Sequence, residues 1–210
     1  MSIANRMTIN SKYASMIKHF LLLSTILVLT SFTPPKHATK WVISQNSSLT
    51  INGNTNVNKF SCAISSYPKT DTIIINEAKA NENLMLTGAL TLSVKNFECN
   101  NVMMTHQFRK TLKHEEFPLL YITFLSLKEF PNPNQKINLI KGLVAIKIAG
   151  ITKKFEICYQ LEFVNNNLVL RGNQDIKFSD FKLVAPQRIG KLIKAKDQLN
   201  VVFELKMKLA

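Results

Sequence analysis

Histidines and cysteines are the residues of this chain that could hold a metal or act as nucleophiles. There are four His, and two of them, His19 and His37, lie in or beside a basic, apolar N-terminal segment, whereas His106 and His114 are eight residues apart. A metal site normally draws His, Cys and carboxylate ligands from tight spacings, and no such cluster accompanies these residues. We therefore expect no metal site and a surface or helix-flank position for His106 and His114.

Nucleophilic catalysis would need a Ser or Cys beside a His and an orienting acid. Cys158 and His106 could form such a pair, but no G-x-S-x-G turn, glycine-rich phosphate loop or carboxylate pair frames them. Asp180 fits turn and capping chemistry better than the role of a base. The sequence therefore predicts a protein that is not an enzyme, with no catalytic residues and no cofactor.

The three cysteines, Cys62, Cys99 and Cys158, are compatible with one disulfide and one free thiol in an exported chain. Phe60 and Cys62 would lie on the same face of one strand, and Phe97 and Cys99 are spaced in the same way. If the two segments are neighbours, a Cys62–Cys99 disulfide would join the first strands to the start of a helix. This bridge is one of the pairings that three cysteines allow. Cys158 alternates with apolar neighbours on its strand and is the candidate for the unpaired thiol.

The charge of the chain is strongly basic, at +14 over 210 residues. Without residues 1–39, which hold four basic and no acidic residues, 23 basic and 13 acidic residues remain, for a net +10. Such a surface suits anionic lipid, an anionic membrane or nucleic acid, and export argues against nucleic acid as a partner. Arg188, Lys191 and Lys194 could bind a lipid head group, or they could form an ordinary solvated loop.

The first 39 residues have the features of an export signal. Three basic residues precede an apolar run at residues 20–32, which is shorter than the roughly 20 residues of a membrane span and is followed by Pro34 and Pro35. We expect an export segment at 1–39, cleaved between Ser31 and Lys40, and a periplasmic or secreted domain at 40–210. An uncleaved N-terminal anchor stays open as the alternative.

Strands and one helix must position these residues. Apolar and polar residues alternate over residues 84–94, which is typical of a strand. Apolar residues then recur every four positions at Met104, Phe108 and Leu112, which predicts a helix with Asn100 as its N-cap. After Pro118 the strand-like alternation returns. This order predicts one short helix packed against, or plugging the end of, a curved antiparallel sheet.

Further alternating segments complete an expected sheet of eight or nine strands. They span residues 48–52, 57–65, 72–78, 136–148, 154–164, 168–172 and 198–209. The clearest two are polar on one face and apolar on the other, and the short connections favour antiparallel pairing. We expect a mainly β protein, an extended antiparallel eight-stranded (eight or nine) barrel that closes on itself.

Large side chains dominate the apolar positions of the alternating segments, and these positions would face the interior of such a barrel. They can fill it, or they can line a slot for one elongated apolar ligand; the sequence leaves both open. The candidate lining residues are Phe60, Leu90, Leu92, Phe108, Ile122, Phe124, Phe155, Ile157, Tyr159, Leu161, Phe178 and Phe203.

Several segments, in order, resemble the YceI-like family of exported lipid-binding domains with a lipocalin-like barrel. The matching segments are SLTING at 48–53, TNV at 55–57, Phe60, FP at 117–118, ITF at 122–124, GL at 142–143, AGITK at 149–153, LRG at 170–172, FSDF at 178–181 and KLIKAKD at 191–197. The resemblance implies a barrel with an internal tunnel for an isoprenoid chain and no catalytic centre. The first strands depart from the family, which usually has a histidine-containing stretch there.

The expected function is therefore an exported, non-enzymatic protein that sequesters or carries a long apolar lipid, an isoprenoid or fatty chain, inside its barrel. The lipid is the expected partner, and an anionic membrane surface is a second. The alternative is a structural or interaction protein of the cell envelope, with a filled barrel and a basic face that binds a partner. A lipid-modifying enzyme would instead need a polar cluster of inward Thr, Asn and Tyr.

Overall fold

The computed structural model describes residues 38–76, 83–165, 167–188 and 192–210 of the chain. Contacts within the chain divide it into Met1–Lys36 and His37–Ala210, and every described residue belongs to the second unit. The expected export segment, except for its last two residues, lies outside the described residues. Lys191 of the expected head-group cluster lies outside them as well.

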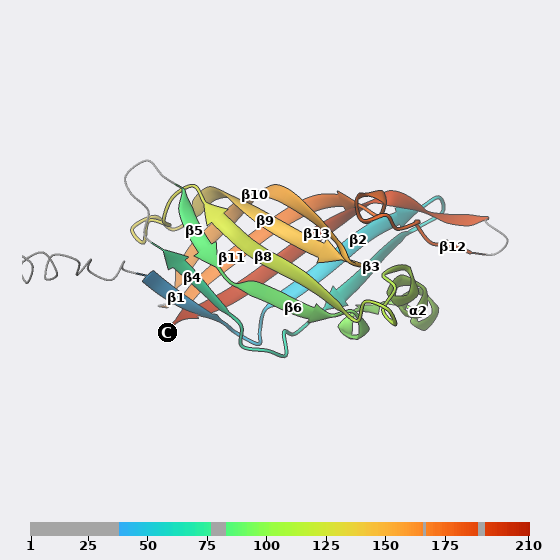
Figure 1. The fold of residues 1–210 in the computed structure, drawn as a ribbon, viewed down its shortest axis with the longest axis horizontal. Coiled ribbons are helices and arrows are strands. Elements are labelled where there is room, and N and C mark those ends of the chain that lie inside the picture. Colours follow the sequence, from blue (N-terminus) through green and yellow to red (C-terminus); the bar gives the residue numbers. More distant parts are fainter. Residues whose placement is uncertain (1–37, 77–82, 166, 189–191) are drawn as a thin grey trace, which may run out of the picture. The chain divides into compact units, whose positions relative to one another are not determined.

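The described residues form a closed antiparallel barrel of eight strands with one short α-helix (Figure 1). Each strand of the ring pairs with the next, and the last pairs with the first. In ring order the strands are β1 (Ala38–Ile43), β4 (Thr72–Asn76), β5 (Leu84–Thr87), β8 (Leu119–Leu127), β9 (Asn138–Ile148), β10 (Ile151–Val164), β11 (Asn167–Lys177) and β13 (Ile193–Leu209). The expected fold class is confirmed.

Two long strands of the ring each pair with two shorter strands in succession. Strand β13 pairs first with β2 (Ser48–Thr55) and then, at its C-terminal end, with β1. Strand β8 pairs with β6 (Ala89–Ser93) and then with β5. The wall therefore has two halves: β1, β4 and β5 close one half, while the other continues from β2 through β3 (Lys59–Ile64) to β7 (Glu98–Cys99).

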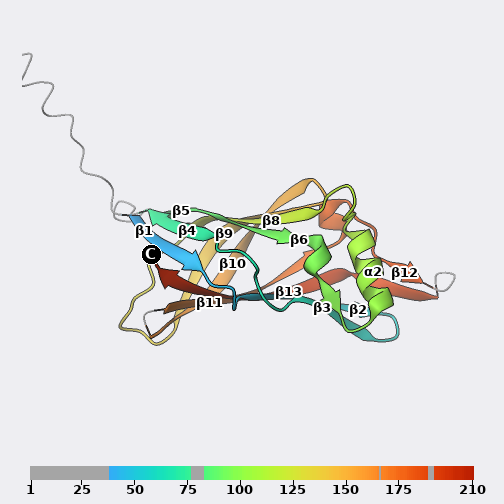
Figure 2. The same ribbon diagram turned by 90° about the horizontal axis from the view of Figure 1, so that it is seen from below.

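A 3₁₀ turn, η1 (Val94–Asn96), connects β6 to β7 along the chain, and the helix α2 (Val102–Thr111) follows β7. No strand pairing joins β6 to β3 or β7 within the described ranges. Figures 1 and 2 both place α2 beside the ends of β6 and β3. The expected helix is present, and it lies where the barrel wall is left unpaired.

Gly88 divides the expected strand at residues 84–94 into β5 and β6, so the expectation of one continuous strand is wrong. A Cβ atom at Gly88 would overlap the carbonyl oxygen of Thr72, and only glycine allows this close approach of the two backbones. The carbonyl of Gly88 accepts a hydrogen bond from the amide of Phe124 at 3.1 Å. The break lets β5 pair with β4 while β6 follows β8 alone.

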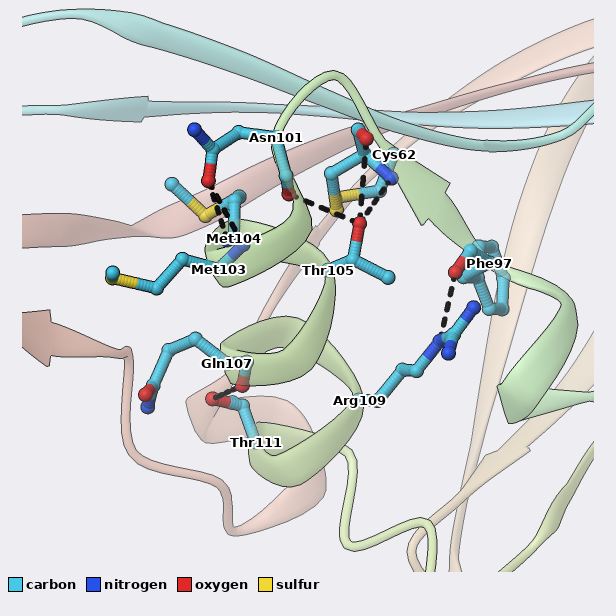
Figure 3. The surroundings of a disulfide bond; sticks show 10 residues. Cys62, Phe97, Asn101, Met103, Met104, Thr105, Gln107, Arg109 and Thr111 are labelled. Atoms are coloured by element: carbon cyan, nitrogen blue, oxygen red, sulfur yellow. Dashed lines mark hydrogen bonds between the residues drawn. A yellow bond between two sulfur atoms is a disulfide. The ribbon is translucent and has the colours of Figure 1, made fainter.

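The helix begins one residue later than the sequence predicted, because Asn101 rather than Asn100 is the N-cap. The side-chain oxygen of Asn101 accepts hydrogen bonds from the amides of Met103, at 2.9 Å, and Met104, at 3.2 Å (Figure 3). These bonds satisfy two of the amides that a helix start leaves without an intrahelical partner.

Three contacts hold α2 to the segment before it. The hydroxyl of Thr105 accepts from the amide of Cys99 at 2.9 Å, and Arg109 Nε donates to the carbonyl of Phe97 at 3.0 Å (Figure 3). Phe108, which is buried, packs edge to face on Phe97 with ring centroids 5.5 Å apart. Phe97 is itself fully buried, so the helix and its connection pack as one body.

A disulfide joins Cys62 of β3 to Cys99 of β7, which face each other in the strand register. It connects the barrel wall to the residues immediately before α2. Cys158 is a free, exposed thiol on β10. Strand β1 was not among the expected strands, and β11 and β13 are longer than the predicted segments at 168–172 and 198–209.

Removal of the disulfide is expected to lower the free energy of unfolding by about 3 to 4 kcal/mol, because the bridge closes a loop with a sequence separation of 37 residues. The measurement is urea unfolding of the Cys62→Ser/Cys99→Ser double variant. Cys158→Ser is the matched control, since its thiol is exposed, and it should change stability by less than about 0.5 kcal/mol. Equal losses in the two variants would contradict this account.

Candidate functional site

An apolar void lies at the centre of the barrel, with a volume of about 30 Å³. Residues from β6, β8, β9, β10, β11 and β13 line it: Leu90, Ile122, Phe124, Val144, Ile146, Ile157, Tyr159, Gln174, Val201, Phe203 and Leu205. A second apolar void of about 10 Å³ shares Leu90 and Leu205 with the first. The two voids are therefore neighbours, separated by these two leucines.

The volume of the central void decides between the two interiors that the sequence left open. A void of about 30 Å³ is far smaller than ligand pockets, which span about 300–1,000 Å³. Side chains therefore fill the interior of the barrel. An elongated lipid could enter only if some of these side chains moved.

Half of the expected lining residues meet at the void, namely Leu90, Ile122, Phe124, Ile157, Tyr159 and Phe203. Leu92 lines the second void instead. Whether any of these seven residues contacts a ligand stays a prediction.

The other five expected lining residues lie elsewhere. Phe60 is at the rim of an outer hollow, Phe108 packs on Phe97, and Phe155 lies 6.4 Å from the ring of Phe181. Leu161 and Phe178 are buried in the core and line neither void.

The sequence-based selection missed Val144, Ile146, Gln174, Val201 and Leu205. Val201 and Leu205 stand on the same parity as Phe203, so the alternation of the last strand contained the signal. Gln174 could not be found in this way. A polar residue at an inward position breaks the apolar alternation that predicts a strand, and the predicted strand ended at residue 172.

Phe203 fills the barrel beside a position that has no side chain. Its register partner across the β11–β13 pair is Gly172, and a Cβ atom there would overlap Cζ of the Phe203 ring. Gly53 and Phe60 repeat the arrangement between β2 and β3. Aromatic rings that cover cross-strand glycines in this way protect the exposed backbone and occupy the interior.

Phe203 also separates the inner void from an outer hollow. Both it and Gly172 contribute to a hollow of about 550 Å³ on the outside of β9, β10, β11, β13 and β2. The wall is therefore thin at Gly172, where one aromatic side chain lies between the inside and the outside.

Arg171 and Glu204, which line the outer hollow, belong to an ion-pair network. Arg171 Nε donates to Glu204 Oε2 at 2.7 Å, and its Nη1 donates to Glu162 Oε2 at 2.9 Å. The hydrogen bond from Arg171 is the main reason that the pKa of Glu204 lies below its usual range. This network connects β10, β11 and β13 on the outside, opposite to the void.

Two of the residues that line the central void carry polar groups. Tyr159 is 1% exposed, and its hydroxyl has no hydrogen-bond partner within the described residues. Burial raises the pKa of the Tyr159 phenol, because the charged form would lie in an apolar interior. The amide nitrogen of Gln174 donates to the carbonyl of Asp175 at 2.8 Å.

Lys194, the expected head-group residue whose side chain the structure describes, is not brought to the void. Arg188 belongs to β12 (Gln187–Arg188), which pairs with the start of β13, and Lys194 is exposed there. The backbone amide of Lys194 donates to Asn56 Oδ1 at 2.9 Å. Seven residues of extended strand, about 23 Å, separate Lys194 from Val201 at the void.

The described part of the chain has neither a metal-binding cluster nor a membrane-spanning helix. Across the described ranges, no three His, Cys, Asp or Glu side chains come together as a metal site would require. No helix in this part of the chain combines the length and the apolar character needed to cross a bilayer.

Comparison with solved structures shows where this fold occurs. BcnA of Burkholderia cenocepacia superposes with a TM-score of 0.55 at 13% identity, over 76% of this chain and 95% of that one. A polyisoprenoid binding domain from Saccharophagus degradans gives 0.56 at 7% identity, over 81% and 98% of the two chains. The chain has the fold of these proteins.

A mutant YceI protein gives a lower TM-score, 0.46, at 19% identity over 64% of this chain and 78% of that chain. No protein-family model matches the sequence. No curated protein matches it either.

The position of the Phe203 ring can be tested with a double-mutant cycle. Gly172→Ala is expected to cost about 1–3 kcal/mol of unfolding free energy, because the new methyl group must displace the ring. In a Phe203→Ala background the same change should cost close to nothing, since the overlap is gone. Urea unfolding of the four proteins measures the coupling, and additive costs would contradict the packing described here.

Proposed function

We propose that this chain is a YceI-like protein: an exported, non-enzymatic binding protein whose barrel takes up one long apolar lipid chain, isoprenoid or fatty. The observation that carries the proposal is the apolar void at the barrel centre, lined from six strands. A solved polyisoprenoid binding domain with the same fold supports it.

The energy of chain burial is sufficient for binding if the interior opens. Each buried methylene gains about 0.8 kcal/mol, so one five-carbon isoprene unit gains roughly 4 kcal/mol. A few units would exceed the cost of association and reach micromolar affinity, about 8 kcal/mol, without a strong polar contact. The apolar walls of the void provide contacts of this kind.

Phe203 is the side chain whose movement would make room. Its ring occupies the central space over Gly172, and Phe203 is only half-buried, unlike Tyr159 beside it. Rotation of this ring toward the outer hollow would join its volume to the void. The lipid would then replace aromatic contacts with its own, which keeps the interior filled in both states.

Export rests on the N-terminal sequence, with its basic start and short apolar run, and places the domain in the periplasm or outside the cell. The basic balance of the remaining chain, a net +10, suits an anionic membrane surface, from which a lipid could be taken or to which it could be delivered.

A second candidate is an interaction protein of the cell envelope with a permanently filled barrel. The small volume of the void, about 30 Å³, favours it. On this alternative Phe203 is a core residue, and its removal would leave a cavity without a ligand.

Lipid extraction and native mass spectrometry distinguish the two candidates. The purified wild-type domain is expected to retain or take up an isoprenoid or fatty chain, and Phe203→Ala should increase the bound fraction because it removes the ring that fills the site. Phe155→Ala is the matched control, since Phe155 is a half-buried phenylalanine outside the void.

Phe203→Ala is also expected to cost up to about 3–5 kcal/mol of stability, part of which added lipid should restore. Apo protein alone in both wild type and Phe203→Ala, with no uptake of added lipid, would favour the filled barrel and overturn the proposed function.

A further inference from the structure

A polar hollow of about 620 Å³ lies on the outside of the barrel, over β3, β2 and the first part of β13. These strands are neighbours in the sheet, with β2 in the middle (Figure 1). The volume falls within the range of ligand pockets, about 300–1,000 Å³, whereas the two inner voids are far smaller. Eight of the ten lining residues have polar side chains, and none of the ten is acidic.

Amide side chains gather in this hollow against the usual preference of strands. Asn is depleted in β-strands, which favour β-branched and aromatic residues. Yet Asn52 and Asn54 occupy successive outward positions of β2, and Asn200 of β13 is the register partner of Asn52. The side chains of Asn52 and Asn54 make no hydrogen bond within the described residues. Strand preference therefore does not account for these amides, and a ligand of the hollow would.

Two further amides are held with their oxygens free. Gln198 Nε2 and Asn200 Nδ2 donate to the two carboxylate oxygens of Asp175 on β11, at 3.0 and 2.7 Å. Asp175 does not itself line the hollow. Because this carboxylate takes their N–H groups, the amide oxygens of Gln198 and Asn200 stay available as acceptors. Hydroxyl groups of a ligand are suitable donors to such oxygens.

Two lysines give the hollow its charge. Lys59 of β3 is the register partner of Asn54, and Lys196 lies where β13 bulges away from β2 between Ala195 and Leu199. Both lysines are exposed, and neither makes an ion pair within the described residues. Adjacent strands are about 4.8 Å apart, so the two lysine backbones, with β2 between them, lie about 10 Å apart. Their side chains can reach one anionic group over Asn54.

We propose that this hollow binds an anionic oligosaccharide, a sugar chain that carries carboxylate or phosphate groups. The amide oxygens accept from sugar hydroxyls, the amides of Asn52 and Asn54 donate to them, and Lys59 and Lys196 pair with the anionic group. A free anion would need the lysines but not the amides, and a neutral sugar would need the amides but not the lysines. The site is outside the barrel and does not depend on the proposed lipid function.

The test measures the binding of three probes by isothermal titration calorimetry: a galacturonate tetrasaccharide, which has a carboxylate on every sugar, the neutral maltotetraose, and inorganic phosphate. Lys59→Gln/Lys196→Gln removes both charges of the hollow. Lys153→Gln/Lys154→Gln is the matched control, because it removes two exposed charges of β10 that do not line the hollow.

The wild type is expected to bind the galacturonate tetrasaccharide more tightly than either other probe, and added salt should weaken this binding because exposed charges are screened. Lys59→Gln/Lys196→Gln should weaken it about 5- to 20-fold, since each exposed charge pair contributes a factor of up to about five. The control variant should change it less than about twofold.

Asn54→Asp is a nearly isosteric second variant that places a carboxylate between the two lysines. The new carboxylate competes with the ligand for both lysines, so galacturonate binding should weaken by about fivefold or more. Its urea midpoint should equal or exceed that of the wild type, because the carboxylate gains cationic neighbours. A loss of binding is then not a loss of folding.

Four results would overturn the inference. Equal weakening by the two double-lysine variants would assign the binding to the net charge of the protein. Phosphate bound as tightly as the tetrasaccharide would reduce the hollow to an anion site, and maltotetraose bound as tightly would remove the role of the lysines. Binding of neither saccharide would leave the hollow without this ligand. None of these results bears on lipid uptake, which native mass spectrometry measures separately.

Discussion

The closure of the sheet through β13 is the constraint on which the rest of the structure depends. This strand of 17 residues pairs with β11 along most of its length and with β2 and then β1 on its other side. From Leu199 to Met207 its apolar residues alternate strictly, and one register with β11 turns them inward. The closure hides unpaired strand edges in the half that contains β1, and it fixes the inward side chains at a common centre.

Where strand pairing stops, covalent and side-chain contacts replace it. Between β6 and β7 the wall has no ladder in the described residues, and the disulfide, the cap at Asn101 and the Phe97–Phe108 contact hold the connecting segment there. The barrel thus has one half held by backbone hydrogen bonds and one that depends on a crosslink and a short helix.

The sequence predicted the barrel, the single helix and most strands, because each depends on local periodicity that burial of one face imposes. It failed where tertiary contacts decide. Gly88 breaks a strand because of the backbone of Thr72, and β1 forms because β4 and β13 offer it two partners. The sequence identified about half of the residues that line the void. The alternation along a strand shows which residues face inward, but it does not show which of them meet at the centre.

A barrel interior that is filled by side chains can still bind a ligand when the side chain that fills it is an aromatic ring packed over a glycine. Phe203 covers Gly172 without a covalent or polar tie, so packing contacts alone hold its ring there. Tyr159 differs, because its ring is buried and its hydroxyl has no partner in the described chain to lose. The two neighbouring aromatics therefore differ: Phe203 is half-buried beside the outer hollow, whereas Tyr159 is buried in the interior.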